Sequence, residues 1–322
     1  MQTLLEVRNL KVYYYLEDGI VKAVDGVNFF IRKGETVGLV GESGSGKSTF
    51  GLSLLRLVPT PGKIVGGQIL FNGTDLARVE ERRIRLLRGK RISMVFQDPM
   101  TSLNPLMRIE EHLMETIRIQ ERLTQKEAER RAKTLLSEVG IPPERGKDYP
   151  HQFSGGMRQR VGIALGIALN PDLLIADEFT SALDVIVQFQ ILSLMKKLRA
   201  SHNMAMIFIS HDISLVSEIA DKIALMYAGQ IVEFAPAVAF FEEHLHPYSR
   251  GLLDSVPNIE LSDQTLSYIP GMPPDLINPP SGCRFYPRCP EAEDKCREKD
   301  PPLIEVKPEY WVKCFKYERK RR

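Results

Sequence analysis

Short, mostly apolar runs bounded by polar residues recur along the chain and predict the central strands of a sheet. Residues 36–40, 92–96, 173–176 and 206–209 form such runs. A strand whose two faces are both covered by helices carries apolar residues without alternation. These runs therefore predict an α/β core.

A different pattern, alternating apolar and polar residues, marks the N-terminal region. It occurs at residues 4–12 and 24–31, on either side of a charged turn at 17–19. Alternation is typical of strands with one buried face. A short strand at 68–71 and the turn Asn72-Gly73 follow, which predicts an antiparallel β subdomain.

Helical periodicity appears between residues 106 and 140, where Thr124 and Glu127 have the spacing of a capping box. Gly140 and Pro142 are expected to end the last helix of this region. We therefore predict a helical subdomain at about residues 103–170.

The composition changes after about Phe234, where many of the 21 prolines and all four cysteines lie. Proline-rich, loop-rich segments of this size commonly form a separate small domain. The expected organisation is an α/β domain at residues 1–234 and a cysteine-containing C-terminal domain at residues 235–322.

Charge and hydropathy narrow the possible partners and location. The 322 residues include 43 basic and 41 acidic ones, so no strong overall field would attract nucleic acid. The longest uncharged apolar stretch, residues 161–169, is far shorter than the ~20 residues of a membrane-spanning helix. The first residues lack the pattern of a signal peptide, and we expect a cytoplasmic protein.

Residues 41–48, Gly-Glu-Ser-Gly-Ser-Gly-Lys-Ser, match the G-x-x-x-x-G-K-[ST] pattern of a phosphate-binding loop. The loop lies between the strand predicted at 36–40 and a helix predicted at 47–57, which Pro59 would end. Lys47 is expected to reach the β- and γ-phosphates, and Ser48 to bind Mg²⁺. The residues expected to contact nucleotide here are Gly41, Ser43, Gly44, Ser45, Gly46, Lys47, Ser48 and Thr49.

Two carboxylates, Asp177 and Glu178, directly follow the buried strand at 173–176. Ligands of open α/β sheets bind at the carboxyl ends of the strands. Asp177 is therefore expected to support the Mg²⁺ shell, and Glu178 to polarise the water that attacks the γ-phosphate.

A second anion site is predicted at Ser154-Gly155-Gly156. Serine is a strong N-cap, and glycines in a first helical turn leave backbone N–H groups uncovered. In their order along the chain, this motif, the phosphate loop and the carboxylate pair resemble the ATP-binding-cassette (ABC) ATPases, with their P-loop fold of a mixed sheet, an antiparallel β subdomain and a helical subdomain.

The resemblance implies further site residues. Gln97 matches the glutamine that contacts Mg²⁺ and reports to the membrane subunits, and His211 matches the histidine that binds the γ-phosphate. Residues 181–184 match the loop that crosses to the opposite subunit. Tyr14, rather than Tyr13, matches the aromatic residue that stacks on adenine. Phe179 departs from the family, which commonly has proline after the glutamate.

Several segments look like the peptide-importer branch of this family; they are residues 153–160, 182–185, 226–229, 246–248, 269–274 and 282–290. The resemblance implies an ATPase that powers import of dipeptides or oligopeptides. Relatives in the same branch move sugars or nickel, so the cargo stays open. The alternative is a soluble cassette ATPase that acts on DNA or ribosomes. The DNA-repair relatives carry a long coiled-coil insertion and the translation factors carry two cassettes, and this sequence has neither feature.

The same resemblance implies the partners of the chain. A second cassette, either a copy or a paralogue, would complete the ATP site. Two transmembrane permease subunits and a separate extracellular peptide-binding protein would complete the transporter, with this chain bound peripherally at the cytoplasmic face of the membrane. No nucleic acid partner is implied.

Cys283, Cys289, Cys296 and Cys314 have the spacing C-x5-C-x6-C-x17-C. It fits none of the short C-x2-C zinc patterns, and a cytoplasmic chain seldom holds disulfides. The spacing alone does not distinguish an iron–sulfur cluster from zinc. The importer branch carries a [4Fe–4S] cluster at these cysteines, which is what the resemblance implies here. Tyr310 and Trp311 stand where a histidine often precedes the last cysteine.

Overall fold

The computed structural model describes residues 2–98, 103–181, 183–255 and 268–321. The chain forms two compact units that are each built from separate stretches of sequence. Unit 1 comprises Met1–Leu4, Ile31–Thr36 and Arg78–Ile209, and unit 2 comprises Leu5–Phe30, Val37–Ala77 and Ser210–Arg322. The phosphate loop and all four cysteines belong to unit 2, and the carboxylate pair belongs to unit 1.

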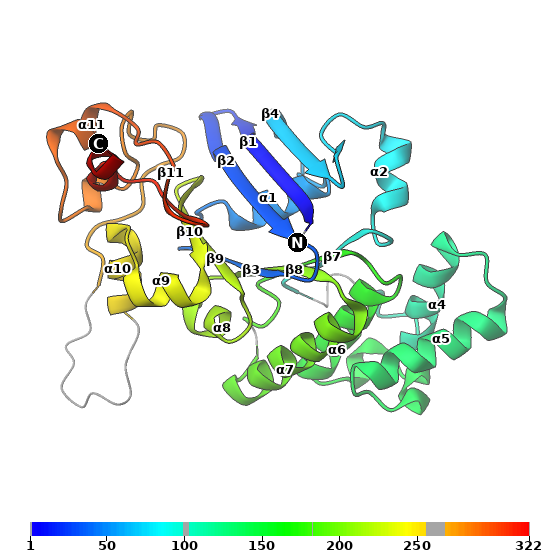
Figure 1. The fold of residues 1–322 in the computed structure, drawn as a ribbon. Helices are drawn as coiled ribbons and strands as arrows, with labels where there is room; N and C mark the ends of the chain where they lie inside the picture. Colours follow the sequence, from blue (N-terminus) through cyan, green and yellow to red (C-terminus); the bar gives the residue numbers. More distant parts are fainter. Residues whose placement is uncertain (1, 99–102, 182, 256–267, 322) are drawn as a thin grey trace. The chain divides into compact units, whose positions relative to one another are not determined.

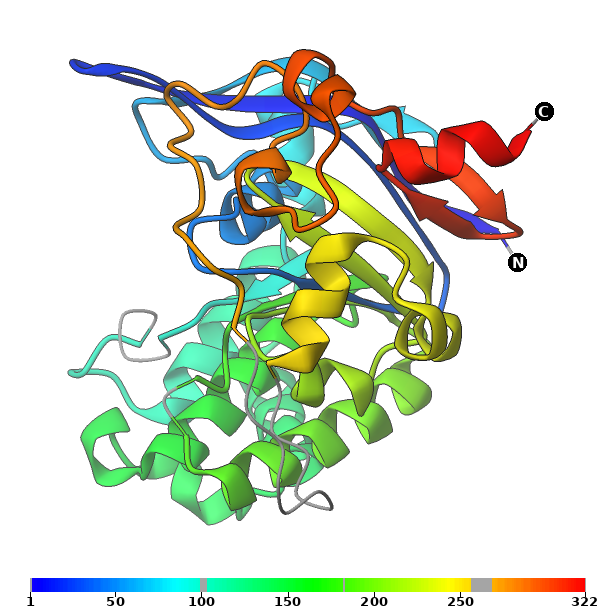
Figure 2. The ribbon, with the colours of Figure 1, turned by 90° about the vertical axis from the view of Figure 1, so that its left-hand side faces the viewer.

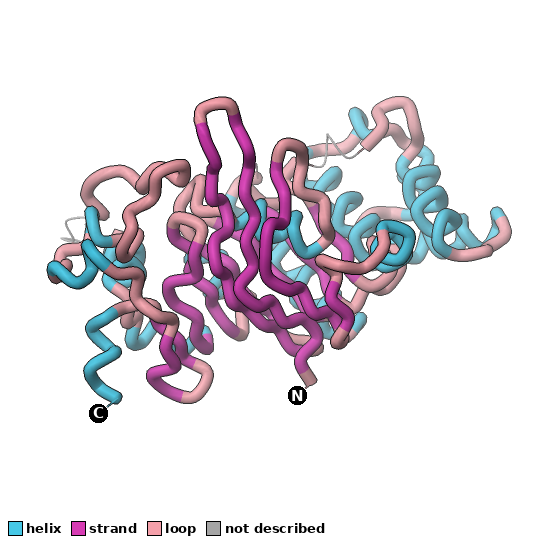
Figure 3. The backbone as a smooth tube through the Cα atoms, turned by 90° about the horizontal axis from the view of Figure 1, so that it is seen from above, coloured by secondary structure: helices cyan, strands magenta, loops and turns pink. Residues whose placement is uncertain are grey.

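The predicted antiparallel sheet is confirmed, with longer strands than expected. Its strands are β1 (Thr3–Leu16), β2 (Gly19–Arg32), β4 (Gly62–Phe71) and β5 (Thr74–Asp75), in the order β2-β1-β4-β5. Figure 3 shows these strands side by side. The hairpin is longer than the alternating segments because β-favouring residues, among them the tyrosines of β1, continue the strands to the turn.

A second group of strands in unit 2 joins the phosphate loop to the C-terminal segment. β3 (Thr36–Val40) pairs in parallel with β9 (Lys222–Tyr227), and β9 pairs antiparallel with β10 (Gln230–Pro236). β12 (Tyr310–Val312) adds to β10, and β11 (Ile304–Lys307) adds to β12. The C-terminal hairpin, red in Figure 2, thus extends the sheet that begins beside the loop.

The helices of unit 2 are short; they are α1 (Lys47–Leu54), α8 (Ile213–Ser217), α9 (Ala237–Glu243), α10 (Pro247–Asp254), α11 (Asp294–Glu298) and the 3-10 turns η3 (Tyr286–Arg288) and η4 (Phe315–Arg321). The expected end of α1 at Leu57 was wrong. Arg56 takes a positive φ of 52°, and the Leu57 N–H donates to the Leu52 carbonyl at 2.9 Å, which closes the helix earlier.

Unit 1 contains three of the predicted central strands, β6 (Ile92–Val95), β7 (Leu173–Asp177) and β8 (Ala205–Ser210), and the structure shows that they pair in parallel in that order. Every residue of β7 and β8 is buried, as their apolar runs predicted. Because β6 pairs in parallel with β7, and β7 with β8, the carboxyl ends of these strands lie at the same edge of the sheet. The residues that follow β6 and β7 therefore lie at that edge.

The helices of unit 1 are α2 (Glu81–Leu87), α4 (Ile109–Gln120), α5 (Gln125–Glu138), α6 (Gly155–Ile167) and α7 (Val185–His202), with the 3-10 turns η1 (Pro143–Lys147) and η2 (Pro150–Gln152). α4 and α5 lie side by side in Figure 1. The capping box of α5 is confirmed, because the Thr124 N–H donates to the Glu127 carboxylate at 2.8 Å and the Thr124 hydroxyl accepts from the Glu127 N–H.

None of the helices in the described parts of the chain combines the length and apolar character that crossing a bilayer requires.

Candidate functional site

The phosphate loop connects β3 to α1 and has room only for glycine at two of its positions. A Cβ atom at Gly41 would lie 2.0 Å from the carbonyl oxygen of Met226. One at Gly46, where φ is 103°, would lie 2.1 Å from the carbonyl oxygen of Ala23. Both neighbours are backbone atoms that cannot turn away, so these glycines allow the loop to lie directly on strands β2 and β9.

Polar groups converge inside this loop. The Lys47 side chain is buried, and its ammonium donates to the carbonyl oxygens of Gly41 at 2.8 Å and Glu42 at 2.9 Å. The Ser45 hydroxyl is buried with no hydrogen-bond partner among the described residues. A buried hydroxyl without a partner, beside a fixed ammonium and the start of a helix, fits a phosphate oxygen as the missing ligand.

The two candidate tyrosines of β1 differ in their surroundings. The Tyr14 hydroxyl lies 3.4 Å from Oγ1 of Thr49 on α1, next to the phosphate loop. The Tyr13 hydroxyl donates to the Asp25 carboxylate at 2.7 Å, and burial raises its pKa to about 12. Tyr13 is thus held in a structural contact, whereas Tyr14 lies beside the loop.

At the carboxyl end of β7, Asp177 is buried and Glu178 follows with a positive φ of 41°. The Glu178 N–H donates to the carbonyl of Ile209 at 3.0 Å, which fixes its backbone at the end of β8. The Gln97 amide donates to the Glu178 carboxylate at 3.5 Å. The structure therefore brings together two residues that lie 81 positions apart, as the strand order requires.

Phe179, where the family commonly has proline, is a core residue. Its ring is buried and meets Phe208 edge to face, with 5.7 Å between the ring centroids. The residue after the glutamate is therefore fixed by packing instead of by a proline ring.

The start of α6, where the sequence predicts an anion site, is capped and exposed. Ser154 caps the helix by accepting from the Met157 N–H at 3.4 Å, and Ser154 and Gly155 are exposed. A Cβ atom at Gly156 would lie 2.7 Å from a methyl group of Val187. An exposed helix start with little side-chain cover presents its backbone N–H groups outward.

The remaining predicted site residues occupy loops. His211 follows β8 and is exposed, and Asp212 after it caps α8. In the segment 181–184, Ser181 donates to the Glu178 carbonyl at 2.9 Å and Asp184 caps α7. Ala182 lies outside the described residues.

The four cysteines line one cavity of about 170 Å³, together with His246, Phe285, Glu291 and other residues of the C-terminal segment. All four are half-buried free thiols. Burial raises the pKa of Cys283 to about 12 and that of Cys289 to about 11, and it also raises the pKa of Cys314.

Backbone N–H groups lie toward the sulfur atoms and oppose this effect of burial. The N–H of Phe285 donates to Cys283, that of Glu291 to Cys289 and that of Lys316 to Cys314. Each hydrogen bond lowers the pKa of its thiol because it stabilises the thiolate. Within the described ranges, however, no group of three or more His, Cys, Asp or Glu side chains is arranged to hold a metal ion.

One contact of the phosphate loop was missed by the sequence analysis. The Glu42 carboxylate pairs with Arg288, and the Glu42 N–H donates to the Tyr248 hydroxyl at 3.0 Å. Glu42 stands at a variable position of the loop pattern, and its partners lie more than 200 residues away. No local signal in the sequence could have paired them.

This combination of glycine-cradled loop, buried lysine, strand-end carboxylates and capped Ser-Gly-Gly helix start defines a P-loop nucleotide-binding protein. Residues 24–181 match the family described as ABC transporter, and residues 232–296 match the C-terminal region of oligopeptide and dipeptide transporters. The chain belongs to the ABC transporter family, which confirms the resemblance found in its sequence.

The relatives extend over nearly the whole chain. The oligopeptide transport ATP-binding protein AppD of Bacillus subtilis is 49% identical over 99% of this chain and 98% of its own length. The OppD protein of Salmonella typhimurium is 47% identical over 97% of this chain and 93% of its own length. The dipeptide transport ATP-binding protein DppD of Escherichia coli is 45% identical, covering 93% and 92%.

Solved structures support the fold class. The ATP-binding cassette MJ0796, in a dimeric post-hydrolysis state bound to ADP and Pi, superposes with a TM-score of 0.64 at 27% identity, covering 72% of this chain and 98% of that one. CbiO1 of Clostridium perfringens gives a TM-score of 0.65 at 26% identity, covering 76% and 92%. The predicted fold of an ABC ATPase domain is thereby confirmed.

Proposed function

We propose that this chain is the ATP-binding and ATP-hydrolysing subunit that powers a membrane importer of peptides. The observation that carries the proposal is the glycine-cradled loop around a buried lysine and a buried serine hydroxyl that has no hydrogen-bond partner in the described part of the chain. The near-complete overlap with transport ATP-binding proteins for oligopeptides and dipeptides supports peptides as the cargo.

Within each site, the residues of this chain have separate tasks. The loop N–H groups and Lys47 bind the triphosphate, and Tyr14 stacks on adenine. Ser48, Gln97 and Asp177 would hold Mg²⁺, which would neutralise charge that develops on the phosphate oxygens. Glu178 accepts a proton from the attacking water, and its contact with Gln97 orients the carboxylate. His211 binds the γ-phosphate.

A second cassette completes the site through the exposed start of its α6. Ser154, Gly155 and Gly156 of that cassette offer backbone N–H groups to the phosphates, so the charge of ATP holds the pair together. Hydrolysis and phosphate release weaken this attraction, and the two cassettes separate. Coupled to two permease subunits at the cytoplasmic face of the membrane, the cycle drives the import of peptides delivered by an extracellular binding protein.

Replacing Glu178 with glutamine tests the catalytic assignment. We expect E178Q to bind ATP with near-normal affinity and to lose turnover by at least about a hundredfold, because a general base is worth 10²–10⁴. Phosphate release and ATP-dependent association of the cassettes would be measured. The matched control E115Q changes an exposed glutamate of α4. Near-normal turnover in E178Q would remove Glu178 from this role.

We further propose that the four cysteines hold a [4Fe–4S] cluster. Two observations support it, namely that all four cysteines line the same cavity and that all four are free thiols, and backbone hydrogen bonding lowers the pKa of three of them against the effect of burial. Thiolate ligands with N–H donors at sulfur are typical of iron–sulfur sites.

Anaerobic purification followed by iron and sulfide analysis tests this second proposal. We expect about four iron and four sulfide per chain with visible absorption, and a loss of both in C289S. A colourless protein loaded with zinc would contradict the cluster. It would leave the ATPase assignment untouched.

A further inference from the structure

Glu42 places a carboxylate inside the loop that is to bind the phosphates of ATP. Its backbone carbonyl accepts a hydrogen bond from the Lys47 ammonium at 2.9 Å, so the backbone of Glu42 borders the anion site. Like charges in a partly buried site repel each other strongly, because little water screens them. An uncompensated Glu42 would therefore oppose nucleotide binding.

Arg288 of the C-terminal segment neutralises this carboxylate. Its Nη1 lies 3.0 Å from both carboxylate oxygens of Glu42, and its side chain is only 6% exposed. The guanidinium is held in turn by the carbonyl oxygens of Pro270 at 3.0 Å and Ile269 at 3.3 Å. The two carbonyl oxygens thus hold the guanidinium in place, and its charge pairs with the Glu42 carboxylate of the phosphate loop.

The backbone of Glu42 is held by the same segment. Its N–H donates to the hydroxyl of Tyr248 at 3.0 Å. Tyr248 is buried against Tyr227 and Phe285, with ring centroids 4.6 and 5.4 Å away. Phe285 also lines the cysteine cavity. The backbone of Glu42 is therefore linked, through the ring of Tyr248, to a residue that lines that cavity.

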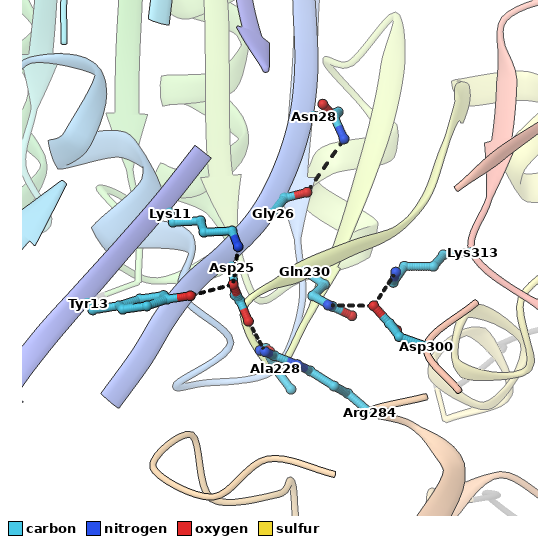
Figure 4. Close-up of polar contacts among 10 residues, drawn as sticks. All are labelled: Lys11, Tyr13, Asp25, Gly26, Asn28, Ala228, Gln230, Arg284, Asp300 and Lys313. Carbon is cyan, nitrogen blue, oxygen red and sulfur yellow. Dashed lines mark hydrogen bonds and ion pairs between the residues drawn. The ribbon is translucent and has the colours of Figure 1, made fainter. Parts of the chain in front are cut away.

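Arg284 provides a second connection, shown in Figure 4. Its guanidinium donates to the Asp25 carboxylate and to the carbonyl oxygen of Ala228. The next residue, Gly229, donates its N–H to the carbonyl of Ser45 in the phosphate loop at 2.8 Å. Arg284 thus holds the turn between β9 and β10, and this turn contacts the phosphate loop at Ser45.

Both arginines are chain neighbours of cysteines. Arg284 follows Cys283 and Arg288 precedes Cys289 in one tight turn, in which the Arg288 N–H donates to the Phe285 carbonyl at 3.0 Å. The Cys283 N–H donates to the carbonyl of Cys296 at 2.8 Å. In a turn this short, a shift of the two sulfur atoms moves the attachment points of both arginines.

We propose that the turn at residues 283–289 positions the phosphate loop, with Arg288 as the positioning residue for ATP binding, and that the chemical state of the cysteines adjusts ATP affinity through it. The inference rests on the proposed binding of ATP by the loop. It does not depend on which group the cysteines hold.

A charge-removal cycle tests the role of Arg288. We expect R288M to weaken ATP binding about tenfold while kcat at saturating ATP changes less, because the contact acts on the bound anion and not on the reacting water. The double variant E42Q/R288M should recover affinity to within about twofold of the wild type, since it removes both charges. The ATP affinity of R288K should lie between that of R288M and that of the wild type. ATP affinity would be measured by titration with a fluorescent ATP analogue.

If Arg288 had only a structural role, E42Q would not restore the ATP affinity that R288M loses. A double variant that binds ATP as weakly as R288M therefore overturns the proposal. So does an R288M variant with wild-type ATP affinity. The matched control K307M breaks a Lys–Glu pair between β11 and α9, whose atoms lie 2.6 Å apart and touch neither loop nor cavity. It should bind ATP normally.

The cysteine link is tested by adding C289S to two backgrounds. In the wild type we expect C289S to weaken ATP binding at least about threefold, and in E42Q/R288M to change it by less than the error of the titration. An equal effect in both backgrounds overturns the link. A wild-type chain that binds no ATP contradicts the proposed function, whereas one that binds ATP regardless of Arg288 contradicts this inference alone.

Discussion

Gly46 shows how strictly a single residue constrains the phosphate loop. The backbone conformation there is left-handed, and the nearest atom to a built Cβ would be a carbonyl oxygen of β2. A side-chain neighbour could rotate away, but a carbonyl within a sheet cannot.

We predict that G46A lowers ATP affinity by at least about tenfold, because the loop must move off β2 to accommodate one methyl group. The measurement is equilibrium titration with a fluorescent ATP analogue. The control G66A lies in β4, where a Cβ would meet Lys11 at an ordinary 3.8 Å. Retention of wild-type affinity in G46A would contradict this account of the loop.

At this scale the sequence predicted those residues whose neighbours in the chain fix their role. Lys47 and Ser48 are recognisable because strand, loop and helix follow one another directly. Arg288 was not predictable, since an arginine in a proline-rich segment carries no sign of its partner. The preference for Tyr14 over Tyr13 rests on the resemblance and stays a prediction; the structure adds that the Tyr13 hydroxyl donates to Asp25.

Among the elements, α5 depends most visibly on a local signal. It is a polar helix, and its N-terminus is closed by reciprocal hydrogen bonds between Thr124 and Glu127. The hydrogen bonds from Thr124 also lower the pKa of Glu127, as expected for an acceptor kept ionised.

We predict that T124A destabilises the protein by about 1 kcal/mol, the usual cost of losing a capping side chain. Urea unfolding monitored by circular dichroism measures the change. The control T134A removes a hydroxyl from the exposed interior of the same helix and should be neutral or slightly stabilising. A loss equal to that of T124A in the control would rule out capping as the cause.

Element existence was predicted better than element ends. The strands β3, β7 and β8 were found because full burial leaves an uninterrupted apolar run. The predicted end of α1 was wrong. Pro59 suggested that the helix continues to Leu57, but the left-handed conformation of Arg56 ends it earlier. A positive φ at arginine is rare and leaves no signature in the sequence.

For the whole molecule, the sequence predicted the fold class through the order of its motifs, but it could not pair distant strands. The addition of β12 to β10 joins residues 77 or more positions apart, through Trp311 opposite Phe234. Trp311 also stacks on Phe234, with ring centroids 5.6 Å apart. Aromatic residues before the last cysteine therefore serve sheet packing, which a motif comparison at that position could not reveal.

The contact between Glu42 and Arg288 spans 246 positions of the chain and has an evolutionary consequence. In a cassette without the C-terminal segment this arginine would be absent, so we expect an acid to be disfavoured at this loop position. Where the C-terminal segment is present, the positions of Glu42 and Arg288 should change together during evolution. The residue at the position of Glu42 would then indicate whether a protein of this family carries the C-terminal segment.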